Sequence, residues 1–193
     1  MALIDLVNYQ STILTATTEA KSINNSFAAA YWPWVQTLDP STGQQVFVPA
    51  STLIPGVYAF NDAAAEVWNA PAGTTRGVMS TAIRAERKLT KTNRDDLYKA
   101  NVNPIATLPT TGVTVFGQKT LKKKQSATDR INVRRLLIEL KLQIGNLADN
   151  LVFEQNTAAT RNNFLAQVNP LLSSIQQRQG LTDFKVVMDE TNN

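Results

Sequence analysis

The sequence predicts an α/β or α+β fold, in which helices flank a mixed β-sheet. Two observations indicate this class. Short apolar runs typical of strands are separated by longer helical stretches, and near the C-terminus apolar residues recur every three or four positions. The chain has 193 residues, of which 43% are hydrophobic, and this suffices for one domain with a core. We therefore expect residues 3–193 to form a single domain.

The first part of the chain is predicted to contain most of the strands. Residues 3–7 are apolar apart from one Asp and are expected to form a short buried strand. Residues 12–22 are a weaker helix candidate with an exposed polar face. Residues 27–35 combine small and aromatic side chains, which suit a buried strand that Pro33 ends. Residues 39–43 have the composition of a turn, which leads to a return strand at residues 45–48.

The middle of the chain is predicted to be mainly helical. Pro55 and Gly56 weaken the first of these helices. Asn93 is expected to cap the last of them, with Asp95 and Asp96 in its first turn. In order, the expected elements are a helix at residues 51–61, a loop at 70–77, helices at 78–89 and 93–100, a break at 101–105 and a short strand at 113–116.

Two long amphipathic helices are predicted near the C-terminus. The apolar residues of the first form a single stripe, made of Val133, Leu136, Leu137, Leu140, Ile144, Leu147 and Leu151. The second spans residues 158–179, where Pro170 should kink or split it and Gly180 should end it. A final strand is expected at residues 183–188.

The composition excludes several classes of active site. The chain contains no cysteine and no histidine, so it cannot hold a thiol nucleophile, a histidine base or a metal ligated by either residue. Glycine-rich phosphate-binding motifs are absent from the sequence, and the acidic residues do not cluster as in a cation site. We expect no enzyme activity, no catalytic residues, no cofactor and no metal. A lysine nucleophile, or a pair of carboxylates that folding brings together, remains an alternative.

The formal net charge of +4 is modest. A nucleic-acid-binding protein usually gathers positive charge on one face and adds aromatic side chains for stacking. The densest basic run, formed by Lys122, Lys123 and Lys124, has no aromatic residue nearby. A solvated loop is therefore the simpler interpretation. A basic α/β nucleic-acid-binding module stays an alternative, as does a hydrolase or transferase with a concave site.

Four short motifs follow one another along the chain. They are W-x-A-P-A-G at residues 68–73, V-N-P-I at 102–105, G-x-x-T-L at 117–121 and N-V-R-R at 132–135. In this order they resemble the C-terminal core region of contractile tail sheath proteins. The resemblance covers nearly the whole chain and departs at a few positions, such as Phe116, where many sheaths carry Trp.

The resemblance implies a structural subunit of a contractile bacteriophage tail. Such subunits stack as rings around a tail tube, link through arms that add strands to neighbouring sheets, and contract to drive the tube through a bacterial envelope. The implied partners are other sheath subunits, the tube, the baseplate and the tail terminator, in a virion tail assembled in the host cytoplasm. Neither nucleic acid binding nor membrane insertion is expected. A sheath of a phage-derived injection machine would carry the same motifs.

The family also implies further segments around this region. Sheath proteins of this kind have a large N-terminal region, and they continue past the D-x-x-N-N segment at residues 189–193 into an arm. We therefore expect a core domain that lacks both and does not build tubules alone. Without donated strands it should have an exposed strand edge. The candidate edge is the final strand, with Phe184, Val186 and Met188.

The resemblance further suggests residues that contact the tube or another subunit. Positive residues on the inner face of such sheaths can meet an acidic tube. Arg134 and Arg135 have an equally simple structural role, in which they hold carboxylates of their own domain. The candidates are Lys122, Lys123, Lys124, Arg130, Arg134, Arg135 and Lys141.

Overall fold

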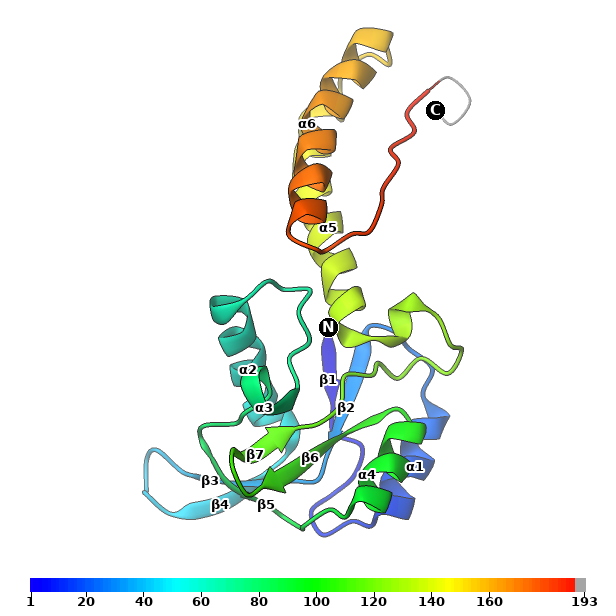
Figure 1. Ribbon diagram of the computed structural model, residues 1–193. Coiled ribbons are helices and arrows are strands. Elements are labelled where there is room, and N and C mark those ends of the chain that lie inside the picture. The colour runs from blue at the N-terminus through cyan, green and yellow to red at the C-terminus, as the bar shows by residue number, and fades with distance from the viewer. Residues whose placement is uncertain (190–193) are drawn as a thin grey trace. The chain divides into compact units, whose positions relative to one another are not determined.

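The computed structural model describes residues 1–189 and confirms the predicted α/β class (Figure 1). The chain divides into two compact units. The first, Met1–Arg135, contains all the strands assigned in the described residues. The second begins at Leu136 and contains most of helix α5 and all of helix α6.

A four-stranded mixed sheet forms the centre of the first unit. Its strands lie in the order β1 (Ala2–Ile4), β2 (Ala28–Trp32), β6 (Val102–Leu108) and β7 (Gly112–Val115). The strands β1, β2 and β6 run parallel, whereas β6 and β7 form an antiparallel hairpin. Parallel neighbours need a crossover connection, and helix α1 (Ile13–Ser22) supplies the one between β1 and β2.

A three-stranded antiparallel sheet with the order β4-β3-β5 lies in the same unit. β3 (Val35–Leu38) pairs with β4 (Gln45–Val48), as the predicted hairpin requires, and with β5 (Ala82–Ala85) on its other side. In the connecting turn, Gly43 has a φ of +68°, which favours glycine. The Asp39 carboxylate accepts hydrogen bonds from Ser41 and Thr42, which lower its pKa to about 2.

All five residues of β2 are buried. Because successive side chains of a strand point to opposite faces, β2 contributes to two cores. Helix α2 (Ala50–Ala64) covers one face, and helices α1 and α4 (Lys91–Lys99) cover the other. The alanines of β2 allow these helices to approach the sheet closely. The first core includes Ala29, Tyr31, Ile54, Val57 and Ile105, and the second includes Ala28, Ala30, Trp32, Ala16 and Leu97.

Helices α5 (Ile131–Ala148) and α6 (Ala158–Gln177) confirm the two predicted long amphipathic helices. Their apolar stripes supply the buried residues of the second unit, which are Leu136, Leu140, Val168, Leu172 and Ile175. Of the two expected effects of Pro170, a kink or a split of the second helix, the split does not occur, because α6 continues through it. Pro170 deprives the Ala166 carbonyl of its helical donor, but Ala166 is exposed and water can replace the donor.

Two predictions in the middle of the chain are wrong. Residues 78–89, predicted to be helical, contain β5, because pairing with β3 outweighs their local pattern. Residues 101–105, predicted to be a break, contain the first part of β6 at the centre of the sheet. Pro104 suggested a break because it cannot donate to a ladder, but it lies opposite Trp32, the last residue of β2.

The remaining corrections concern the ends of helices and a few short helical turns. Helix α2 begins at Ala50 and contains Pro55 in its interior. Thr90 caps α4 in place of Asn93, because the Thr90 side chain accepts the Asn93 N–H at 3.2 Å. A single helical turn, α3 (Gly73–Arg76), replaces part of the predicted loop at residues 70–77. Two short 3-10 helices, η1 (Ala127–Asp129) and η2 (Asp149–Leu151), flank α5.

The buried side chain of Asn103 joins the centre of the sheet to residue 119. Its Nδ2 donates to the carbonyls of Ala30 at 3.0 Å and Lys119 at 2.8 Å, and its Oδ1 accepts the Lys119 N–H at 2.6 Å. Removal of the amide leaves three backbone groups without these partners in a buried region.

We expect Asn103→Ala to lower the free energy of unfolding by about 2–4 kcal/mol, because buried polar groups that lose hydrogen bonds are costly. Urea denaturation would measure the change. Asn8→Ala, at an exposed position, is the matched control and should change the stability by less than about 0.5 kcal/mol. Equal stabilities of the two variants would contradict the role assigned to Asn103.

Candidate contact surfaces

One edge of the four-stranded sheet has no neighbouring strand among residues 1–189. Strand β1 lies at its end and, among the described residues, pairs only with β2. The Ala2 N–H donates to the Phe27 carbonyl at 2.8 Å, so the N–H and C=O of Leu3 point away from β2. The opposite edge is covered by residues 77–79, where the Val115 N–H donates to the Gly77 carbonyl at 2.8 Å.

The predicted C-terminal strand is not formed. Residues 183–188 belong to no helix or strand, so this prediction is wrong. A segment becomes a strand only by pairing with another segment, and neither described sheet includes these residues. The alternating pattern is nevertheless present, because Phe184, Val186 and Met188 are half-buried and the residues between them are exposed. The D-x-x-N-N segment extends outside the described residues.

The predicted basic contact residues Lys122 and Arg130 have partners within the first unit. Lys122 Nζ donates to Thr128 Oγ1 at 2.9 Å. Arg130 donates to the Tyr98 hydroxyl, and its Nε lies 3.3 Å from an Asp129 carboxylate oxygen. Both side chains are half-buried. They therefore stabilise the segment before α5.

Arg134 and Arg135, in the first turns of α5, also bind groups of the first unit. Arg134 Nη2 donates to Ser26 Oγ at 2.6 Å, and its guanidinium lies 4.1 Å from the ring centroid of Phe27. Arg135 Nη2 lies 2.6 and 2.5 Å from the two carboxylate oxygens of Asp62. Arg135 thus holds a carboxylate of its own unit, which is the structural alternative considered above.

A buried tyrosine and a partly buried one lie beside Arg135. The hydroxyls of Tyr31 and Tyr58 are 2.7 Å apart, and the Arg135 guanidinium lies 4.7 Å from the ring centroid of Tyr58. Burial raises the pKa of both tyrosines, that of Tyr31 well above its usual range. The pair is therefore neutral at physiological pH, and Arg135 contacts it through the ring face.

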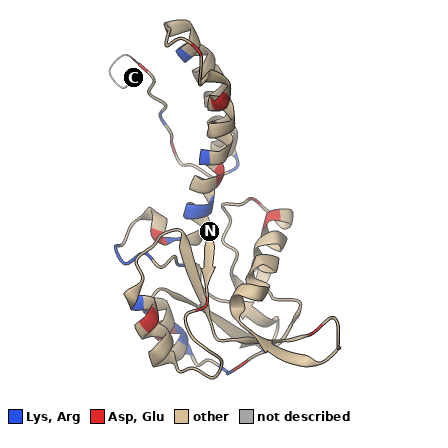
Figure 2. Ribbon diagram, turned by 180° about the vertical axis from the view of Figure 1, so that it is seen from behind, with Lys and Arg blue, Asp and Glu red and all other residues tan. Residues whose placement is uncertain are grey.

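The other basic candidates are exposed. Lys123 and Lys124 lie in the loop before η1, and Lys141 lies on α5 in the second unit. Acidic positions are interspersed with the Lys and Arg positions along the chain (Figure 2). The candidates between residues 122 and 135 lie in the first unit, whereas Lys141 lies in the second.

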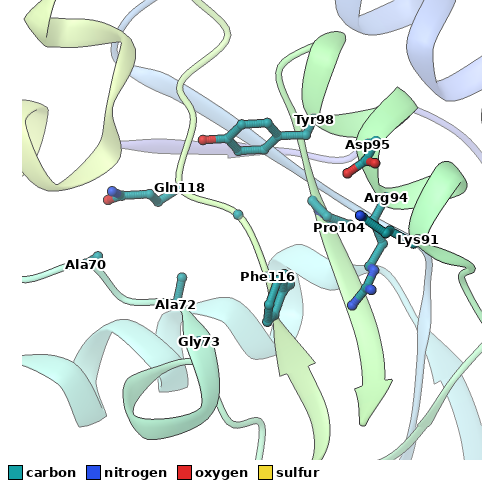
Figure 3. Close-up of a pocket in the computed structure, with 11 residues that line it drawn as sticks. Ala70, Ala72, Gly73, Lys91, Arg94, Asp95, Tyr98, Pro104, Phe116 and Gln118 are labelled. Atoms are coloured by element: carbon teal, nitrogen blue, oxygen red, sulfur yellow. The ribbon is translucent and has the colours of Figure 1, made fainter.

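A cleft of about 500 Å³ in the first unit was not anticipated from the sequence (Figure 3). Phe116 is 47% exposed at its wall, and the Arg94 guanidinium lies 5.1 Å from its ring centroid. Lys91 and Asp95 of α4 also line it. The sequence carries little indication of this cleft, because only folding brings α4 beside residues 116–118. The remaining lining residues are Ala70, Ala72, Gly73, Tyr98, Pro104, Gly117 and Gln118.

The W-x-A-P-A-G motif forms one wall of this cleft. Gly73 has a φ of +83° and begins α3. Gly77 closes that turn, and a Cβ there would lie 2.6 Å from the Gly73 nitrogen, which no larger residue could accommodate without backbone movement. Arg76 Nε donates to the Ala70 carbonyl at 3.1 Å. The motif therefore builds a rigid wall.

The cleft has little capacity for acid–base chemistry. Asp95 is the single carboxylate residue among its lining side chains. The neighbouring Lys119 donates to the Tyr98 carbonyl at 3.0 Å, and burial together with Arg130 lowers its pKa. Among the described residues, no group of acidic side chains could hold a metal ion. The described part of the chain also contains no helix with the length and apolar character to cross a membrane.

Comparison with models of known protein families found no match. The chain is 34% identical over 172 residues to the tail sheath protein of Vibrio phage KVP40, a match that covers 89% of the chain. It is 31% identical over 192 residues to the tail sheath protein of Enterobacteria phage T4, a match that covers 100% of it. The chain is a homologue of tail sheath proteins. It spans only 26% and 29% of the lengths of these two relatives.

Solved sheath structures share the fold of this sheath homologue. The contracted sheath of the extracellular contractile injection system PVC matches with a TM-score of 0.81 and 26% identity, covering 96% of the chain and 51% of the solved one. The contracted helical sheath of the anti-feeding prophage matches with a TM-score of 0.75 and 26% identity, covering 95% and 48%. A chain of the anti-feeding prophage baseplate matches with a TM-score of 0.73 and 26% identity. This match covers 84% of the present chain and 42% of the baseplate chain. The predicted resemblance to sheath proteins is confirmed.

We expect the Arg135–Asp62 ion pair to contribute measurably to stability in this sheath homologue. A double-mutant cycle with Arg135→Gln and Asp62→Asn should give a coupling energy of about 1–2 kcal/mol, because the Arg135 side chain is only 10% exposed and binds both oxygens. Urea denaturation of the four proteins would measure it.

The matched control is the Lys99–Asp96 pair of α4, whose side chains are 79% and 53% exposed and 3.9 Å apart. Its coupling energy should stay below about 0.5 kcal/mol. Similar coupling energies for the two pairs would show that Arg135 is no more than a surface cation.

Proposed function

We propose that the chain is a structural domain of a contractile phage tail sheath subunit, which polymerises around the tail tube and contracts to drive it through the bacterial envelope. The observation that carries this proposal is the likeness of almost the whole chain to contracted sheaths, together with its identity to phage tail sheath proteins. Because the chain spans about a quarter of those relatives, residues 3–193 act as the core domain of a larger subunit.

The proposed partners are other sheath subunits, the baseplate, the tail tube and the tail terminator. The assembly belongs to the virion tail and forms in the host cytoplasm. We propose no enzymatic activity and no cofactor, since contraction can draw on packing differences between two states of the assembly. The similarity to sheaths of injection systems favours one second candidate, a sheath of a phage-derived injection machine.

The open edge of β1 is the proposed site of linkage between subunits. An exposed strand edge accepts an extended segment through backbone hydrogen bonds, and Leu3 presents one N–H and one C=O there. A donated strand would carry apolar side chains at alternate positions, as Phe184, Val186 and Met188 do. We propose that this segment, or the chain around it, takes part in such an exchange.

Electron microscopy of the complete sheath protein that carries this sequence would test the function, with helical tubules of sheath width as the expected result. Leu3→Pro should abolish the tubules, because it removes the N–H that faces away from β2. Leu3→Ala removes the same apolar side chain but keeps the N–H, and should still assemble. Tubules from the proline variant would contradict linkage at β1, and a complete protein that never forms tubules would contradict the sheath function.

Exposed lysines are the best candidates for contact with the tube. Of the seven basic residues predicted, Lys123, Lys124 and Lys141 are exposed, whereas the other four contact groups of their own unit. Desolvated or committed side chains are less available to a partner, so we propose the loop at residues 123–124 as the primary tube contact, with Lys141 as a second.

We expect the double variant Lys123→Glu, Lys124→Glu to bind the tube at least tenfold more weakly and to show a shallower loss of binding with salt, because exposed charges are screened. Co-sedimentation of assembled sheath with tube between about 50 and 300 mM NaCl would measure both. Lys21→Glu, Lys88→Glu, at two other exposed lysines, makes the same change in net charge. Equal loss in both double variants would contradict a specific contact.

A further inference from the structure

The connection between α5 and α6 exposes two adjacent apolar side chains at its tip, which we define as residues 149–154. Phe153 is fully exposed, and Val152 is 65% exposed. Single exposed apolar residues are common, but an aromatic side chain with no cover next to a second apolar one is typical of a contact site. Asp149 and Glu154, both exposed, give this tip a negative charge.

Local hydrogen bonds give the tip a defined conformation. The Glu154 N–H donates to the Leu151 carbonyl at 3.0 Å. Thr157 caps α6 by accepting the Thr160 N–H at 3.2 Å. A tip that is ordered before binding loses little conformational entropy when it docks.

The cleft beside Phe116 has the complementary properties. It combines apolar walls with the cationic side chains of Lys91 and Arg94 and one opposing carboxylate, Asp95 (Figure 3). Its volume of about 500 Å³ lies within the range of roughly 300–1,000 Å³ that is typical of sites for small ligands, so an aromatic ring and a neighbouring aliphatic side chain fit.

We propose that the tip at residues 149–154 of one copy docks into this cleft on a second copy. Phe153 packs against Phe116, and Glu154 pairs with Lys91 and Arg94, which outnumber the neighbouring carboxylate of Asp95 in the lining of the cleft. The inference deepens the proposed sheath function, on which it rests. Its two surfaces differ, so the contact is heterologous and can propagate along a helical array.

A second copy is the occupant that the structure favours, because the same chain carries both halves of a matching pair. The tip is acidic and apolar, and the cleft is basic and apolar. The net charge of the whole chain is +4, so two copies have no general electrostatic attraction, and an association must come from local complementarity. Complementary charges at a contact mainly fix its register and partner.

Cysteine cross-linking tests the contact directly, because the chain has no cysteine of its own. A Gln155→Cys protein, mixed with an Ala72→Cys protein under mild oxidation, should form the mixed disulfide at least tenfold faster than the control mixture of Gln155→Cys with Thr110→Cys. Gln155 and Thr110 are exposed, and Ala72 lines the cleft. Equal rates would overturn the proposal. A disulfide that forms only within one chain of a Gln155→Cys, Ala72→Cys double variant would also overturn it.

Self-association by sedimentation analysis gives an independent measure. Phe153→Ala should weaken association at least tenfold, whereas Phe60→Ala, at another exposed phenylalanine outside the cleft, should not. Glu154→Arg should weaken it and Arg94→Glu should restore it in the double variant, while the control Glu19→Arg has no effect. Failure of the Phe153 and Glu154 variants to change association would refute the docking and leave the sheath function to be decided by the tubule experiment.

Discussion

Backbone hydrogen bonding in the parallel sheet is the constraint on which the rest of the fold depends. Strand β2 is buried on both faces, so each of its N–H and C=O groups must find a partner within the protein. Strands β1 and β6 provide these partners from either side, and helices then cover both faces. The same arrangement leaves β1 at the margin, where its outer groups are available to water or to another chain.

Two polar side chains, one buried and one half-buried, fix the surroundings of this sheet. Asn103 links β2, β6 and the chain at Lys119 through three hydrogen bonds. Arg135 holds Asp62 and covers the tyrosine pair, which anchors the first turns of α5 to the end of α2. Neither residue is placed to do chemistry. Both keep the surfaces of the first unit in a defined relation to one another.

The proposed contact surfaces differ in their physical means of recognition. The β1 edge offers backbone groups, which bind an extended segment with little dependence on its side chains. The cleft and the exposed tip offer an aromatic anchor surrounded by charge, which depends strongly on side-chain identity.

Local sequence patterns were enough to predict the α/β class, the return strand of the hairpin at residues 45–48 and the two long amphipathic helices, because periodicity and turn composition are local properties. The order of its motifs also indicated the sheath family. Only the tertiary fold shows that Ala82–Ala85 pair as a strand, that Pro104 lies in a central strand and that residues 183–188 join no described sheet. The fold also shows which arginines contact groups of their own unit and which residues line the cleft. Strand pairing and clefts depend on residues far apart in the sequence, so local patterns carry little information about them.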